Sequence, residues 1–473
     1  MPDFFSEPFV HLAGLTHKSA LVAWGAFYFR VKNSGKEFKL LEDDDLDKIH
    51  PPRRETIGAR SEPYGNARVI VSDLAGNEIA SAFTSNTNHC WVAGLEPDTE
   101  YTYKVIVNGE EWARGERRDW VSGGDGKGLT LKGRSYSNRF RTHPDPTRAS
   151  PSPFTFAVLG DFGVGIRKDK EDRHQRQIAE ALERAVTEHN IRLILTTGDN
   201  IYRSGGFLGS GGQTGDEDDD WYFTYYQPYR YVINRVPVYP SIGNHDADET
   251  ESRDDRTQLE DNFYVRERVA GEEAAGRASF EPGQGLFYRF RYSSEVEFVC
   301  VDTSKEPSTG FKDRLFKHPK HSEFLKSALP DAGGAAASWR IPFCHHPPFS
   351  AGPKHSNTKG MEALVEQFRR AGVRAVFSGH EHNFQHCRSN GVDYFVTGGA
   401  GKVRTDKPKK SAFEKAHTLS WAAQPHFLLV TVEGKRMTVQ PIAQLGPGGA
   451  LSEIGRLAPD NSQVSEPIVI SLS

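Results

Sequence analysis

Five times beyond residue 153, an apolar run of strand length is followed by a short string rich in Asp, Asn or His. The five runs are Phe154–Leu159, Ile191–Leu195, Val236–Ile242, Trp339–Phe343 and Val373–Phe377. The strings after them are Gly160-Asp161-Phe162-Gly163, Gly198-Asp199-Asn200-Ile201-Tyr202, Gly243-Asn244-His245, Cys344-His345-His346-Pro347 and Gly379-His380-Glu381-His382. Ligands gather at the carboxyl ends of strands in α/β sheets, so these strings are expected to converge in space.

A helix is expected between the first two runs, roughly over Glu171–His189. Its apolar positions recur at helical spacing and form one face, made of Ile178, Ala181, Leu182, Ala185 and Val186. This strand-helix-strand order implies parallel strands in an α/β domain. Further strands are expected at 298–301, 427–432, 437–442 and 468–470, the last three as outer strands of a second sheet.

Residues 1–142 are predicted to form an all-β domain. Its strand-like runs are Ala20–Phe29, Ala67–Val71, Ile79–Thr84 and Glu100–Val107. In the last run Tyr101, Tyr103, Val105 and Val107 share one face. Short strands at this spacing indicate a β-sandwich. Residues 143–153 are rich in Pro, Thr and Ser and are predicted to be a linker, which leaves 154–473 as the α/β domain.

The segment Leu95–Tyr103 resembles the late strands of the fibronectin type III family, which carry a similar spacing of Leu, Pro, Thr and Tyr. The resemblance covers one strand pair. It implies a fibronectin type III-like sandwich for residues 1–142.

Composition and charge exclude several classes of protein. The net charge of the 473 residues is -4, so no basic excess indicates nucleic-acid binding. No apolar run approaches the roughly 18 residues of a membrane helix. Met1–Glu7 lacks the features of a secretory signal, which predicts a cytoplasmic protein; export by an unrecognised route and trimming of the chain are the alternatives.

The chain has four cysteines, Cys90, Cys300, Cys344 and Cys387, with no close pair. This is too few for a disulfide scaffold and the wrong spacing for a thiolate zinc site. They are interpreted as small buried residues, with a disulfide as the alternative.

Each polar string is a weak signal alone, because Gly-Asp often marks a turn, Asn can cap a helix and Tyr usually packs. Together they bring six side chains to strand ends: Asp161, Asp199, Asn244, His345, His380 and His382. Carboxylate, imidazole and amide ligands suit zinc, iron or manganese. Six ligands are too many for one tetrahedral ion, which favours two ions that share a bridge, as in sites that catalyse phosphoryl displacement.

The five strings resemble the five motif blocks of the purple acid phosphatases, a branch of the calcineurin-like metallophosphoesterases, over about residues 154–445. Larger members of that family also carry a fibronectin-like N-terminal domain. The resemblance implies an α/β metallophosphoesterase domain of two sheets flanked by helices. The chain as a whole is therefore predicted to be an α+β multidomain protein, with its catalytic domain at 154–473.

The resemblance also implies which residues bind each metal. The first ion, ferric in the family, would be held by Asp161, Asp199, Tyr202 and His382. The second ion, divalent iron, zinc or manganese, would be held by Asp199, Asn244, His345 and His380. Asp199 would therefore bridge the two ions.

One departure from related enzymes supports Tyr202 as a ligand. Other metallophosphoesterases place a ligand His two residues after the first Asp, where this chain has Gly163. Tyr202 would supply the missing donor, and a phenolate suits a trivalent ion. A second departure is the stretch Asn383-Phe384-Gln385-His386, where the family often has Tyr and then Arg. His386 is interpreted as a structural or supporting residue rather than a ligand.

Three further histidines are expected near the substrate. His245 matches the family residue that protonates the leaving group or orients the phosphate. His355 falls where plant members have substrate-facing histidines. His346 either faces the pocket or packs.

The predicted function is hydrolysis of phosphate monoesters of the acid phosphatase type, with a metal-bound hydroxide attacking phosphorus. The alternatives are a phosphodiesterase or broad phosphoesterase with the same metals, and a binding protein with a vestigial site. The expected partners are small phosphorylated substrates, with no nucleic acid, no membrane and no specified oligomeric state. Loops 204–220 and 247–257 are expected to be solvated and to shape substrate choice.

Overall fold

The computed structural model describes residues 4–32, 37–41, 66–85, 87–121, 128–130, 133–150, 153–167, 174–202, 220–247, 253–268, 286–304, 319–331, 338–444 and 448–472. Most of the loop 204–220 and residues 248–252 lie outside these ranges, so their expected role in substrate choice stays a prediction. The backbone from Arg253 on is helical, which corrects the expectation of a loop up to residue 257.

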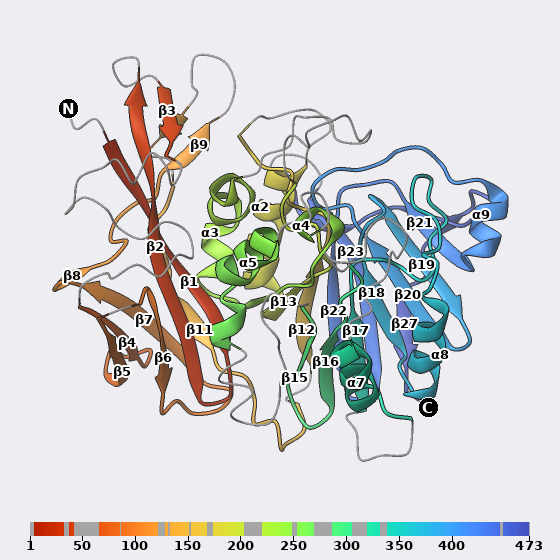
Figure 1. Ribbon diagram of the computed structural model, residues 1–473, viewed down its shortest axis with the longest axis horizontal. Coiled ribbons are helices and arrows are strands. Elements are labelled where there is room, and N and C mark those ends of the chain that lie inside the picture. Colours follow the sequence, from red (N-terminus) through yellow and green to blue (C-terminus); the bar gives the residue numbers. More distant parts are fainter. Residues whose placement is uncertain are drawn as a thin grey trace.

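The N-terminal part is a pair of antiparallel sheets (Figure 1). One sheet contains β1 (Phe4–Leu15), β2 (Ser19–Lys32), β3 (Glu37–Leu40) and β6 (His89–Ala93). The other contains β4 (Ala67–Ser72), β5 (Glu78–Thr84), β7 (Glu100–Val107), β8 (Glu110–Glu111) and β11 (Arg139–Arg141). A small pair is formed by β9 (Asp119–Val121) and β10 (Gly128–Thr130).

The two sheets pack on a shared apolar core, because alternate residues of each strand point inward. Trp24 of β2 is fully buried in this core with Val69 of β4. On β7 the predicted face is the buried one, with Tyr101, Tyr103 and Val105 inside. The expectation of an N-terminal all-β region is confirmed.

The second part contains two sheets, as expected. The seven-stranded sheet has the order β14-β13-β12-β22-β23-β24, with β27 paired to β23. Its strands are β12 (Phe154–Leu159), β13 (Ile191–Thr196), β14 (Val238–Tyr239), β22 (Phe427–Glu433), β23 (Arg436–Gln444), β24 (Leu451–Glu453) and β27 (Ile468–Ser471). The third apolar run is thus a strand over two residues only.

The nine-stranded sheet has the order β15-β16-β17-β18-β20-β19-β21-β25-β26. Its strands are β15 (Tyr288–Arg291), β16 (Val296–Cys300), β17 (Trp339–Phe343), β18 (Ala375–Ser378), β19 (Phe384–Ser389), β20 (Val392–Thr397), β21 (Thr418–Ala422), β25 (Arg456–Leu457) and β26 (Gln463–Val464). Strands β16, β17, β18 and β20 are parallel.

The position of one C-terminal strand, β22, differs from the expected one. β22 was expected at the outside of a second sheet, but it pairs antiparallel with β12 in the centre of the first, with Val158 opposite Leu428. All residues of β12 are buried, and Phe156 packs edge-on against Phe298 and Phe377 of the other sheet. A strand in the middle of a sheet needs a hydrogen-bonded neighbour at each edge; β13 lies at one edge of β12, and β22 from the C-terminal part lies at the other.

Helices lie on both sides of the two sheets (Figure 1). They are α2 (Gln175–Glu188), α3 (Gln227–Ile233), α4 (Asn244–Ala247), α5 (Arg253–Asn262), α7 (Pro319–Ala328), α8 (Glu362–Arg370) and α9 (Lys410–Lys415). The predicted apolar face of α2 is buried. Helices α2, α3 and α5 lie between the sandwich and the sheets in Figure 1. None of the helices in the described ranges is long and apolar enough to cross a membrane.

The sandwich and the α/β part share one core. Phe27 of β2 packs against Tyr222 and Tyr226, which lie in a π-helical turn before α3. The Tyr103 hydroxyl donates a 2.7 Å hydrogen bond to the carbonyl of Asn234. His143, at the start of the predicted linker, is buried with its ring 5.2 Å from that of Tyr292.

All four cysteines are free, and three of them, Cys300, Cys344 and Cys387, are buried. Burial raises the pKa of Cys344 and of Cys387 to about 12. Protonated buried thiols behave as small apolar groups. The interpretation as buried residues holds for these three, while Cys90 is half-buried, and the disulfide alternative is wrong.

Candidate metal centre

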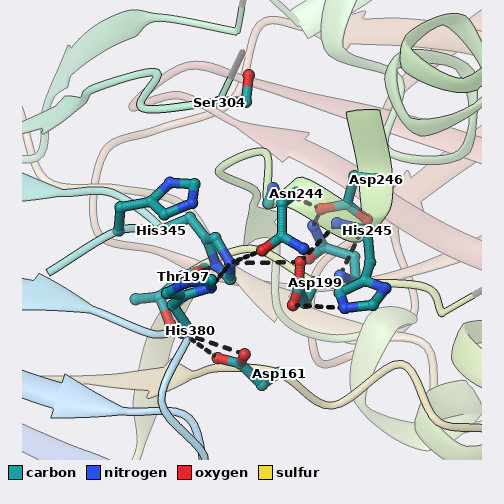
Figure 2. A network of polar contacts seen from close by, with 12 residues as sticks. Asp161, Thr197, Asp199, Asn244, His245, Asp246, Ser304, His345 and His380 are labelled. Atoms are coloured by element: carbon teal, nitrogen blue, oxygen red, sulfur yellow. Dashed lines mark hydrogen bonds and ion pairs between the residues drawn. The ribbon is translucent and has the colours of Figure 1, made fainter. Parts of the chain in front are cut away.

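The polar strings meet at the carboxyl ends of strands from both sheets. Asp161 follows β12, Asp199 follows β13, and Asn244 and His245 begin α4 just after β14. His345 follows β17 of the other sheet, and His380 and His382 follow β18. Figure 2 shows Asp161, Asp199, Asn244, His345 and His380 in one network of polar contacts.

Three of these residues have a left-handed backbone. The φ angles are +56° at Asp161, +51° at Asp199 and +71° at His380. Non-glycine residues rarely adopt this conformation, and it concentrates at functional sites. In each case the left-handed residue stands in the turn just after a strand and is itself one of the predicted ligands.

Glycines beside these residues allow the loops to approach one another. A Cβ on Gly198 would lie 2.6 Å from Nδ1 of His345, and one on Gly379 would lie 2.3 Å from Oδ2 of Asp161. A Cβ on Gly243 would lie 2.2 Å from the backbone N of Asp199. Only glycine fits at these contacts, which explains why the motifs begin with Gly.

The first group of donors surrounds Nε2 of His345. Its other nitrogen, Nδ1, donates a 2.8 Å hydrogen bond to the carbonyl of Thr197, which leaves a lone pair on Nε2. Nε2 lies 2.9 Å from Oδ1 of Asn244 and 3.4 Å from Oδ1 of Asp199. Nδ1 of His380 lies 3.1 Å away. Several acceptors this close together favour a cation between them.

The second group lies around Asp161. The Tyr202 hydroxyl donates to Oδ1 of Asp161 at 3.3 Å and lies 3.1 Å from Nε2 of His382. Ligand atoms of Asp161, Asp199 and His382 all lie within 4.8 Å of one another, and the three residues are buried. Oxygen and nitrogen donors thus face one small space.

The charges of the two carboxylates also favour cations. Burial, together with the negative charge of Asp199, raises the pKa of Asp161 well above its usual range. Burial alone would raise the pKa of Asp199 too, but His345 and His245 hold it below the usual value. Two buried carboxylates that repel each other are stabilised by positive charge placed between them.

The imidazoles are in the form that binds metals. Burial lowers the pKa of His380 and of His382 well below the usual value, with further lowering by nearby histidines and, at His382, by Arg404. Burial also lowers the pKa of His345. Neutral imidazoles present a lone pair, so the donor set fits metal ions.

Gly163 packs against the loop that carries Tyr202. A Cβ on Gly163 would lie 2.3 Å from the backbone carbon and oxygen of Asn200. The structure therefore has no room for a histidine at position 163. Burial and the charges of Asp199 and Asp161 raise the pKa of Tyr202 well above its usual value, so its phenol is protonated unless a strong Lewis acid binds it.

The three further histidines surround this centre. The ring of His245 packs on that of Tyr202 with centroids 4.3 Å apart, and its Nε2 lies 4.0 Å from Oδ2 of Asp199. His355 packs on His380 with centroids 4.0 Å apart. Ring nitrogens of His345, His346 and His380 lie within 4.8 Å of one another.

This last group places His346 near enough to His345 and His380 to take part in binding a metal, although the resemblance to the family favoured His345 over His346 as the ligand. Nδ1 of His346 lies 3.1 Å from the hydroxyl of Thr303, which follows β16. His386, by contrast, is buried away from the centre, where its Nε2 lies 2.6 Å from Asp393.

Asp246 is a supporting residue whose role the sequence reasoning missed. Its carboxylate accepts hydrogen bonds from the backbone N–H of Asn200, Ile201 and Gly243 and from the side-chain amide of Asn200, at 2.7–3.2 Å. It thereby joins the second and third motifs. Burial and the charge of Asp199 raise its pKa to about 7. Its place directly after Asn244-His245 was the available signal.

Glu381 and Arg404 were missed as well. Nη1 of Arg404 donates to Oε1 of Glu381 at 3.1 Å, and the backbone N–H of Arg404 donates to the carbonyl of His382 at 2.8 Å. Glu381 stands inside the last motif, but no sequence pattern pointed to Arg404.

Comparison with known proteins agrees with this geometry. Residues 154–384 match the calcineurin-like phosphoesterase family. The chain is 25% identical over 280 residues to purple acid phosphatase 4 of Arabidopsis thaliana, covering 54% of this chain and 71% of the relative. It is 24% identical over 258 residues to tartrate-resistant acid phosphatase type 5 of Oryctolagus cuniculus, covering 51% of this chain and 71% of the relative.

Two solved structures share the fold over nearly the whole chain. The structure of PhoD has a TM-score of 0.62 and 13% identity, and the match covers 98% of this chain and 94% of PhoD. A purple acid phosphatase from yellow lupin (Lupinus luteus) has a TM-score of 0.54 and 15% identity, with 98% and 74% covered. The chain carries a calcineurin-like phosphoesterase domain, has homologues among the purple acid phosphatases, and is a hydrolase that acts on phosphoric esters.

Proposed function

We propose that the chain hydrolyses phosphate monoesters at a centre of two metal ions, ferric iron and a divalent iron, zinc or manganese ion. The observation that carries this proposal is the position of Asp199. Its Oδ1 lies 3.4 Å from Nε2 of His345 in one donor group, and its carboxylate also belongs to the group of Asp161 and His382. A carboxylate common to two donor groups is placed to bridge two ions.

The ligands follow from these groups. Asp161, Asp199, Tyr202 and His382 would hold the ferric ion, and Asp199, Asn244, His345 and His380 the divalent ion. When bound, the ions supply Lewis acidity that activates water near neutral pH and neutralises charge on the phosphoryl oxygens. Tyr202 favours a trivalent ion on one side because a phenolate is a hard anionic donor.

The chain's own residues then orient the reaction. The His245 backbone N–H donates to Oδ1 of Asp199 at 3.0 Å, which holds the bridging carboxylate in place. The His245 side chain is half-buried beside Tyr202, where it can pass a proton to the departing alkoxide. His346 and His355 lie against His380 and would contact the phosphate oxygens.

Metal analysis and a visible spectrum of the purified protein test the metal assignment. We expect two ions per chain and a tyrosinate-to-iron charge-transfer band. A colourless protein with two zinc or manganese ions would contradict the assignment of iron but would still agree with a hydrolase that uses two metal ions.

Paired assays on an aryl phosphate monoester and the matching diester test the substrate class. We expect the monoester to be hydrolysed faster. If the diester is hydrolysed faster, the proposed monoesterase function is wrong and the protein is a phosphodiesterase. Absence of metal and of activity after reconstitution with iron and zinc or manganese would support a vestigial site.

A further inference from the structure

A positively charged side chain contacts the last motif from a loop that none of the motifs includes. The loop follows β20 and crosses the last motif, where the backbone N–H of Arg404 donates to the carbonyl of His382 at 2.8 Å. Arg404 is therefore anchored directly on a proposed metal ligand. Its side chain is 20% exposed, so it is also accessible to a small molecule.

Glu381 holds this side chain in place. It stands between His380 and His382 in the chain, and its side chain is fully buried. Oε1 accepts a 3.1 Å hydrogen bond from Nη1 of Arg404. Oε2 accepts the backbone N–H of Lys354 at 3.1 Å and of His355 at 2.6 Å. One buried carboxylate thus joins the last motif to two separate loops.

The guanidinium keeps donors for a ligand. It carries five N–H groups, and within the described part of the chain its side chain donates a hydrogen bond to one acceptor, Oε1 of Glu381.

We propose that Arg404 binds the phosphate group of the substrate through the N–H donors that Glu381 leaves open, and that Glu381 positions both Arg404 and the His355 loop for this contact. The proposal rests on the proposed phosphoesterase function and adds a residue that selects the substrate. A guanidinium fork matches two phosphate oxygens at once, which a point charge cannot do.

This arrangement has a consequence for substrate class. A monoester at neutral pH carries close to two negative charges and leaves three terminal oxygens, so the metals and Arg404 can share it. A diester has one charge and one fewer free oxygen. Arg404 should therefore contribute more to binding of monoesters than of diesters.

The test compares the variants Arg404→Gln, Arg404→Lys and Glu381→Gln with Lys407→Gln in the metal-loaded protein. Lys407 is an exposed lysine on the same loop, so its variant controls for loss of one positive charge. The readouts are metal content, the KM and kcat for an aryl phosphate monoester, and the inhibition constant of inorganic phosphate.

For Arg404→Gln we expect the KM and the phosphate inhibition constant to rise roughly 10- to 100-fold, the value of a charge-assisted hydrogen bond. The kcat should fall less and the metal content should not change. Arg404→Lys and Glu381→Gln should give smaller rises in both constants, and Lys407→Gln none.

Unchanged phosphate inhibition in Arg404→Gln with both metals bound would overturn the proposal and leave a structural ion pair. If Arg404→Gln does not fold, the proposal is tested with Arg404→Lys. An unchanged inhibition constant of inorganic phosphate in that variant rules out a contact of the guanidinium with two phosphate oxygens. Calorimetric titration of inorganic phosphate into metal-loaded protein separates this outcome from failure of the proposed function, since phosphate binding is measured even if no ester is hydrolysed.

Discussion

The backbone N–H of Tyr202 donates a 3.0 Å hydrogen bond to the carbonyl of Gly163. The glycine that removes a ligand from the first motif is thus in direct contact with the residue proposed to replace it. A histidine at position 163 would collide with the backbone of the loop that presents Tyr202. The structure has room for one of these two ligands and contains the tyrosine.

Tyr202→Phe should remove the charge-transfer band of the iron-loaded protein, because the phenyl ring lacks the oxygen that donates to ferric iron. The measurement is the visible spectrum together with metal content. Tyr229→Phe is the matched control, since Tyr229 is also a buried tyrosine and belongs to neither of the two donor groups. A band that survives in Tyr202→Phe would exclude this tyrosine as an iron ligand.

Gly163→Ala should destabilise the protein and weaken metal binding. The added Cβ would lie 2.3 Å from the backbone of Asn200, so the Tyr202 loop must move. Overpacking of this kind costs about 1–3 kcal/mol. Denaturant unfolding and metal analysis measure the two effects. Gly455→Ala, where the nearest atom is 3.7 Å from the added Cβ, is the control, and equal stability of the two variants would contradict this account.

Asp246→Asn should lower stability by about 1–3 kcal/mol, the cost of leaving a buried donor without an acceptor. Each carboxylate oxygen of Asp246 accepts two N–H groups, from Gly243, Asn200 and Ile201, so an amide –NH2 in place of either oxygen would face another donor. Activity should fall as well, because the second and third motifs lose their link.

Unfolding curves and kcat measured on the same samples check the Asp246 prediction. Asp145→Asn is the control, because the Asp145 carboxylate accepts hydrogen bonds from neighbouring Thr147 and lies 3.6 Å from the exposed Arg148 side chain, so it links no two motifs. An Asp246→Asn protein with the stability and kcat of the parent would show that the link is dispensable.

His11 should make stability sensitive to acid. It is fully buried in the interface among Tyr225, Tyr226 and Tyr264, and burial, with the nearby Arg268 charge, lowers its pKa to about 3. The unfolded chain takes up a proton near pH 6.5 and the folded chain only near pH 3. The unfolded state therefore binds more protons in this window, and stability falls as pH falls through it, by up to about 1.4 kcal/mol per pH unit.

The measurement for His11 is the free energy of unfolding between pH 7 and pH 4 for the parent and for His11→Gln. The variant should show a shallower decline with acid, whatever its stability at pH 7. His189→Gln, at the exposed end of α2, is the control and should follow the parent. Parallel curves for the parent and His11→Gln would contradict the prediction.

The spacing of apolar residues along the sequence predicted most of the strands and helices well. The limits of β7 and β17 agree with the predicted runs, and the buried face of α2 is the predicted one. Strand and helix periods are short-range, so they can be read from neighbouring residues. The run 236–242 failed as a full strand because an apolar run can be buried without joining a ladder.

By itself, the sequence determined which side chains stand at strand ends and which glycines let them turn inward, since both depend on residues next to one another. Only the tertiary structure decided that two sheets contribute to the centre, that β22 lies beside β12, and that Arg404 reaches His382. These depend on long-range pairing and packing, which bring together residues that no local period connects. The Arg404 contact shows this best, because the residue lies 22 positions beyond His382 and outside every motif.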